Sequence, residues 1–174
     1  TGVQTCALPI LLGPLANPIA PEFQLIGVGA LKYVRPMAEA IARLGIRKAL
    51  IVHSRDGLDE LSPAAPSDAV LVEGQSLSDL VVDPATLGVK GNLADLQGGD
   101  ADDNFKILEA LLRSGATPPA AAVALNAGAV LWLAGAAKDL REGYALATKQ
   151  LTLGTAGRFF TTWLATAQAE GSAK

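Results

Sequence analysis

The sequence predicts an α/β fold: a mostly parallel sheet with helices on both faces. Two apolar runs, "FQLIGVG" at 23–29 and "KALIVH" at 48–53, flank an amphipathic segment at 33–44. Strand, helix and strand in this order form a unit whose strands are parallel, and a parallel sheet is covered on both sides. The chain has 174 residues, of which 50% are hydrophobic, so we expect one domain with a substantial core.

The helix expected at 33–44 follows from the spacing of its apolar residues. These recur every three or four positions, at Val34, Met37, Ile41 and Leu44. Pro36 falls in the first turn, where proline is tolerated, and Gly45 supplies a stop. The preceding segment, 11–23, is interrupted by prolines, so we expect a turn-rich connection there and no continuous helix.

Two weaker strands follow, at 68–73 and 77–83. Gly74 lies between them, which indicates a hairpin at the edge of the sheet. Loops with short turns are expected from there to residue 99. Asp100 then suits the N-cap of a helix, because Ser, Thr, Asp and Asn are the usual capping residues. The rest of the chain predicts helices at 100–113, 119–137, 139–153 and 156–169.

The most apolar helix, 120–137, has nearly the length of a membrane span. It consists mainly of Ala and Gly, however, and Asn126 lies in its middle. We therefore interpret it as a buried core helix and expect no membrane span. Asn126 is expected to be a buried polar group whose hydrogen bonds are satisfied, in preference to a ligand.

Charge and composition narrow the class of protein. The net charge is −3 and aromatic residues make up 5% of the chain, so neither a basic footprint nor a stacking platform for nucleic acid is expected. One cysteine, Cys6, excludes a disulfide framework and a cysteine-based zinc site. These features are typical of a cytoplasmic protein.

The first ten residues, "TGVQTCALPI", have the features of neither a natural start nor a signal peptide. They match the translation of a widely used sequencing-library adapter. We therefore expect residues 1–10, Cys6 included, to be non-native, residues 11–170 to form a partial α/β domain, and residues 171–174 to be a frayed tail. An upstream part of the protein is expected to be missing.

Two adjacent carboxylates, Asp59 and Glu60, come shortly after the strand at 48–53. In open α/β sheets, ligands bind outside the carboxyl ends of the strands. Mg²⁺ uses one or two carboxylates and takes its other ligands from water and substrate phosphates. The pair is thus a candidate metal site; the alternative is an ordinary solvated acidic loop.

Four segments in order resemble anthranilate phosphoribosyltransferases: "LLGPLANP" (11–18), "QLIGV" (24–28), "HSRDGLDELSP" (53–63) and "LNAGAVLWLAG" (125–135). The resemblance extends over 11–169. It implies the C-terminal α/β part of the nucleoside phosphorylase and phosphoribosyltransferase type, with the N-terminal helical domain missing. It also implies transfer of phosphoribosyl from phosphoribosyl pyrophosphate to anthranilate, with release of pyrophosphate.

The same resemblance assigns Asp59 and Glu60 to a Mg²⁺ site at the pyrophosphate and no residue of this chain to catalysis. The family's substrate-binding residues would lie upstream of Leu11, as would the helical domain through which its members form homodimers. We therefore expect this chain alone to be inactive.

Two alternatives stay open. One is a non-catalytic or nucleic-acid-binding relative of the same fold, which the net charge disfavours. The other is a pyrimidine nucleoside phosphorylase-like enzyme, which also acts at C1 of ribose. His53, the only histidine, is expected to have a structural role at the end of its strand, in preference to acid–base catalysis.

Overall fold

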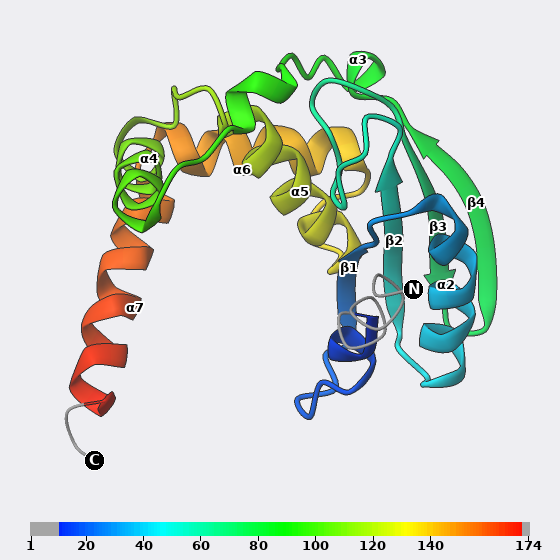
Figure 1. The fold of residues 1–174 in the computed structure, drawn as a ribbon. Helices are drawn as coiled ribbons and strands as arrows, with labels where there is room; N and C mark the ends of the chain where they lie inside the picture. Colours follow the sequence, from blue (N-terminus) through cyan, green and yellow to red (C-terminus); the bar gives the residue numbers. More distant parts are fainter. Residues whose placement is uncertain (1–10, 172–174) are drawn as a thin grey trace, which may run out of the picture.

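The computed structural model describes residues 11–171. Residues 1–10 and nearly all of the expected tail lie outside this range. One four-stranded sheet organises the described chain, with the strands side by side in sequence order (Figure 1). The strands are β1 (Phe23–Gly27), β2 (Lys48–Ser54), β3 (Ser67–Glu73) and β4 (Ser76–Val82).

The direction of the strands corrects the sequence-based expectation. Only β1 and β2 pair in parallel, whereas β2–β3 and β3–β4 are antiparallel, so a mostly parallel sheet was wrong for the described residues. Parallel neighbours need a long crossover, usually a helix. The connection at 55–66 contains no helix, and the turn at Gly74 closes the predicted hairpin. The α/β class is confirmed.

Helices cover both faces of the sheet, as predicted. Helix α2 (Val34–Arg43) covers one face. Its apolar residues, including Met37 and Ile41, form one core cluster with Ile51 of β2 and Val72 of β3. Helix α5 (Ala120–Leu133) packs on the other face, together with residues of β2 such as Leu50. Gly45 follows the C-terminal end of α2 with a φ of 76°, a conformation that glycine adopts without strain.

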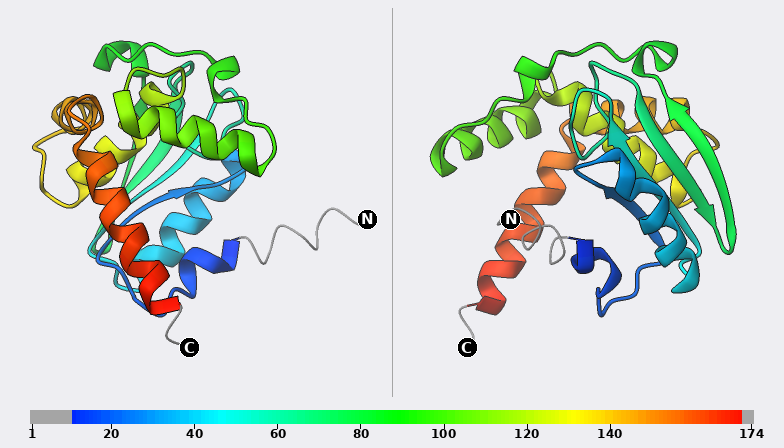
Figure 2. Two further views of the ribbon diagram at one scale, coloured as in Figure 1. Left: turned by 90° about the vertical axis from the view of Figure 1, so that its left-hand side faces the viewer. Right: turned by 45° about the vertical axis from the view of Figure 1, so that its right-hand side comes forward.

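Helix α3 (Pro84–Leu87) directly follows β4 at the end of the sheet. Helices α4 (Ala101–Ser114), α6 (Leu140–Thr152) and α7 (Thr155–Gly171) form, with α5, an arch that leads away from the sheet (Figure 1). The right-hand view of Figure 2 shows α7 extending away from the sheet and from α2. Asp100 caps α4 as predicted, since its side chain accepts a hydrogen bond of 2.9 Å from the amide of Asp103. None of the described helices combines the length and apolarity that crossing a membrane requires.

Helices α5 and α6 meet through two glycines. A Cβ at Gly128 would lie 2.5 Å from the backbone nitrogen of Tyr144, and a Cβ at Gly143 would overlap the carbonyl oxygen of Gly128. The two helices therefore approach to backbone contact. This close packing fixes α5, and with it Asn126, relative to α6.

Candidate functional site

The predicted carboxylate pair lies on the loop formed by residues 55–66, which we call the carboxylate loop. It leaves β2 at its carboxyl end and returns as β3. The loop turns back at once, because the amide of Ser54 donates to the carbonyl of Leu58 at 2.9 Å. Gly57 has a φ of 98° in this turn, in the left-handed region that other residues avoid.

The loop also reaches the carboxyl end of β1. A Cβ at Gly27, the last residue of β1, would overlap the carbonyl oxygen of Asp59. Only glycine leaves room for this approach. Asp59 therefore lies where the two parallel strands of the sheet both end, which is the position expected for a ligand site in an α/β fold.

Helix α5 contacts the carboxylate loop directly after Asp59 and Glu60, through hydrogen bonds between Asn126 and Leu61. The Asn126 side-chain oxygen accepts a hydrogen bond of 3.0 Å from the amide of Leu61, and its nitrogen donates to the Leu61 carbonyl at 2.9 Å. The same nitrogen donates to the carbonyl of Ala122 at 3.0 Å. The expectation of a satisfied polar group is confirmed.

A third carboxylate stabilises the base of the loop. The hydroxyl of Ser62 donates to Asp56 at 2.6 Å and accepts from the amides of Ala64 and Ala65. Burial acts to raise the pKa of Asp56, but hydrogen bonds from hydroxyl and backbone groups, Ser62 among them, outweigh burial and lower it. Asp56 is therefore a charged structural acceptor.

Glu60 is surrounded by negative charge, and no positive group among the described residues lowers its pKa. Asp59 is exposed and Glu60 is partly buried. Burial raises the pKa of Glu60, and the negative charges of Asp59 and Asp56 raise it further. A cation beside Glu60 would relieve this excess of negative charge, which is the electrostatic condition for a metal site.

The donor set decides which metal is compatible. Among residues 11–171, no group of three or more His, Cys, Asp or Glu side chains is arranged to hold a metal ion. Two neighbouring carboxylates fit Mg²⁺, which keeps several waters and completes its shell with phosphate oxygens. They do not fit a closed, all-protein site. The assignment of Asp59 and Glu60 as metal ligands stays a prediction.

A family model described as glycosyl transferase family, a/b domain, matches residues 3–157. The chain belongs to this family. The match starts inside the segment expected to be non-native, so the boundary at residue 11 stays a prediction.

Several relatives of this glycosyl transferase a/b domain are named anthranilate phosphoribosyltransferase. The anthranilate phosphoribosyltransferase of Idiomarina loihiensis is 40% identical over 154 residues, covering 87% of this chain and 45% of that protein. The enzyme of the same name from Rhodospirillum rubrum is 42% identical, covering 84% of this chain and 42% of that protein. The chain thus spans less than half the length of these relatives, and neither alternative considered from the sequence is supported by them.

Solved structures of anthranilate phosphoribosyltransferases have a fold similar to that of this chain. The crystal structure of anthranilate phosphoribosyltransferase from Thermus thermophilus matches with a TM-score of 0.79 at 36% identity, covering 89% of this chain and 46% of that one. The Saccharomyces cerevisiae enzyme in complex with PRPP (phosphoribosyl pyrophosphate) and Mg matches with a TM-score of 0.74 at 23% identity, covering 84% and 44%. The latter likeness shows the fold alone.

His53 of this transferase domain has a structural contact. Its Nδ1 lies 2.8 Å from the carbonyl oxygen of Val28, so the ring bridges the ends of β1 and β2. Beside it, Arg55 makes two hydrogen bonds to Asp68, of 3.0 and 2.7 Å. This arrangement is that expected for a structural histidine.

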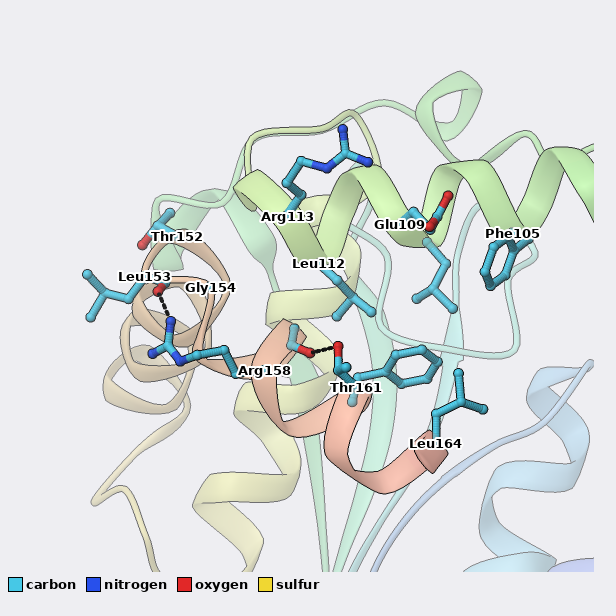
Figure 3. A pocket seen from close by; sticks show the side chains of 13 residues that line it. Phe105, Glu109, Leu112, Arg113, Thr152, Leu153, Gly154, Arg158, Thr161 and Leu164 are labelled. Carbon is cyan, nitrogen blue, oxygen red and sulfur yellow. Dashed lines mark hydrogen bonds between the residues drawn. The ribbon is translucent and has the colours of Figure 1, made fainter. Parts of the chain in front are cut away.

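A groove near the C-terminal helix lies away from the carboxylates. The groove, of about 590 Å³, lies between α4 and α7 and is lined by both apolar and polar side chains, among them Phe105, Leu112 and Arg113 (Figure 3). Arg158 in this groove is turned back to the carbonyl of Leu153 at 3.1 Å. Neither Asp59 nor Glu60 lines the groove, so we do not assign the candidate chemistry to it.

Proposed function

We propose that this chain is a fragment of an anthranilate phosphoribosyltransferase and that its carboxylate loop contributes Asp59 and Glu60 to a magnesium site. The observation that carries the proposal is the placement of both acids where β1 and β2 end, between the close contact at Gly27 and the hydrogen bonds at Leu61. The names of the relatives at 40–42% identity support it.

The proposed reaction transfers phosphoribosyl from phosphoribosyl pyrophosphate to anthranilate. When bound, Mg²⁺ would supply stabilisation of the negative charge that develops on the departing pyrophosphate. The chain's own part is to hold two carboxylates in fixed positions at an open edge, so that phosphate oxygens can complete the coordination. No side chain of this chain is proposed as a nucleophile.

The proposed site is incomplete in this chain. Groups that hold anthranilate and the far side of the diphosphate are proposed to come from the upstream part of the parent, which we also propose to be a homodimer through its missing domain. Without them the two substrates cannot be oriented, and orientation supplies a large share of such a rate enhancement. We expect the chain alone to form no phosphoribosyl anthranilate; turnover by a purified sample would contradict this.

Metal binding can be tested directly on this chain. Mn²⁺ serves as a paramagnetic probe, and its titration into ¹⁵N-labelled protein should first broaden the amide signals of residues 59–61. The double variant Asp59→Asn, Glu60→Gln should abolish this broadening, and excess Mg²⁺ should reverse it in the wild type.

Another adjacent acid pair offers the matched control. Asp102 and Asp103 lie exposed in the first turn of α4. Their replacement by Asn should leave the broadening at residues 59–61 unchanged. Broadening that follows the acids of α4, or that survives loss of Asp59 and Glu60, would sink the assignment.

A further inference from the structure

The contact of Asn126 with the carboxylate loop carries an inference that deepens the proposed function and rests on it. Asn126 is one polar residue in an otherwise apolar helix. Both hydrogens of its amide nitrogen are used, in hydrogen bonds to the carbonyls of Leu61 and Ala122, and its oxygen accepts from the Leu61 amide. Asn126 is therefore tied to the main chain of the carboxylate loop, through which it can influence the proposed site.

The two hydrogen bonds to Leu61 fix more than that residue. The amide nitrogen of Leu61 belongs to the peptide plane shared with Glu60, and the Leu61 carbonyl belongs to the next plane. Holding both ends therefore limits rotation of the backbone on either side of Leu61. The Leu61 side chain is fully buried in the core that also contains Leu125 and Ala129.

The main chain next to Glu60 is thus held by a neighbour on α5. The main-chain carbonyl of Asp59 lies against Gly27. Mg²⁺ demands near-ideal octahedral geometry, so small displacements of its carboxylates matter. We infer that Asn126 is a positioning residue of the proposed magnesium site: through its hydrogen bonds to Leu61 it fixes the main chain next to Glu60, and it contacts neither metal nor substrate.

A second asparagine, Asn104, also bonds through its side chain to both the amide and the carbonyl of one residue, at a different place in the fold. Asn104 on α4 accepts from the amide of Gly99 at 3.1 Å and donates to the Gly99 carbonyl at 3.0 Å. It lies at the N-terminal end of α4 and makes none of the hydrogen bonds of the carboxylate loop. It is the matched control, because it tests whether loss of any such pair of hydrogen bonds has the same effect.

The experiment compares Asn126→Leu, Asn126→Asp and Asn104→Leu with the wild type by Mn²⁺ broadening of the signals of residues 59–61 and by thermal unfolding. Asn126→Leu should weaken Mn²⁺ binding about tenfold, the range seen when a group that orients metal ligands is removed. Asn104→Leu should lower the melting temperature without changing Mn²⁺ affinity.

Asn126→Asp is the second variant, and it decides the matter if Asn126→Leu does not fold. It keeps the size and the acceptor for the Leu61 amide but cannot donate to the Leu61 carbonyl. It should shift the loop's amide signals and alter Mn²⁺ affinity. Unchanged affinity in a folded Asn126 variant, with localised binding in the wild type, overturns the positioning role and leaves the proposed function standing. Absence of localised binding in the wild type overturns both.

Discussion

The carbonyl oxygen of Asp59 occupies the space that a side chain at Gly27 would need. The contact joins the end of β1 to the loop that follows β2, although the two residues are far apart in sequence. It makes the position of the carboxylate pair depend on a residue that carries no side chain.

Gly27→Ala should therefore displace the carboxylate loop. Because the clash is with rigid backbone, we expect a loss of about 1–3 kcal/mol in the free energy of unfolding. Mn²⁺ binding at residues 59–61 should weaken as well. Urea unfolding and the Mn²⁺ titration check these two effects. Gly29→Ala is the control, since a Cβ there meets nothing within 4 Å, and equal behaviour of the two variants would refute the role of the contact.

The raised pKa of Glu60 predicts a pH dependence of stability. In the folded state the carboxyl retains its proton above its ordinary value of 4.5. The folded protein then binds more protons than the unfolded chain, so this group's contribution to stability falls as pH rises from about that value through the folded pKa. Glu60→Gln should remove this decline, as measured by urea unfolding at several pH values. A decline that persists undiminished in the variant would show that another group causes it.

Metal binding should depend on pH in the opposite sense. A metal ligand must be deprotonated, so lowering the pH through the pKa of Glu60 should weaken Mn²⁺ binding. We expect the loss to begin above the ordinary value of 4.5, since the pKa is raised. The titration described above, repeated from pH 7 downward, measures this. Affinity that is constant down to the ordinary value would argue against Glu60 as a ligand.

Ser62→Ala should destabilise the protein by about 1–3 kcal/mol, the cost of leaving buried polar groups without partners. The Ser62 hydroxyl is buried and serves Asp56 as well as two backbone amides. The variant should also raise the pKa of Asp56 toward its ordinary value, so that less stability is lost on acidification than in the wild type. Ser114→Ala, at an exposed serine, is the control for urea unfolding; an equal effect would contradict the prediction.

Gly128→Ala and Gly143→Ala should each separate α5 from α6 and lower stability by about 1–3 kcal/mol. The two glycines touch each other, so the double variant should cost less than the sum of the single ones. Thermal unfolding of the four proteins provides the test. Full additivity would indicate that the two positions do not share one contact.

Much of this fold was predictable because its signals are local. The apolar spacing of α2, the stop at Gly45 and the turn at Gly74 each act within a few residues. The place of Asp59 and Glu60 at the end of β2 followed from recognising that strand. The α/β class and the two-sided cover of the sheet followed in the same way.

What failed or was missed depends on distant contacts. Strand β3 runs antiparallel to β2, because the connection between them contains no crossover helix. The sequence interpretation had extended the parallel pairing of β1 and β2 to the whole sheet. The amide of Asn126 could be expected to find partners, but its partner Leu61 is 65 positions away. The need for Gly27 arises from a tertiary approach and has no local pattern.

The anchors of the carboxylate loop have a consequence for how such an enzyme can be assembled. Gly27, Leu61 and Asn126 all belong to this one chain, so the proposed cation-binding half-site is a self-contained module. If the proposed function holds, a chimera that joins this module to the upstream half of another family member should take its divalent-ion requirement from this module and its acceptor selectivity from the other half. The two properties could then be exchanged independently.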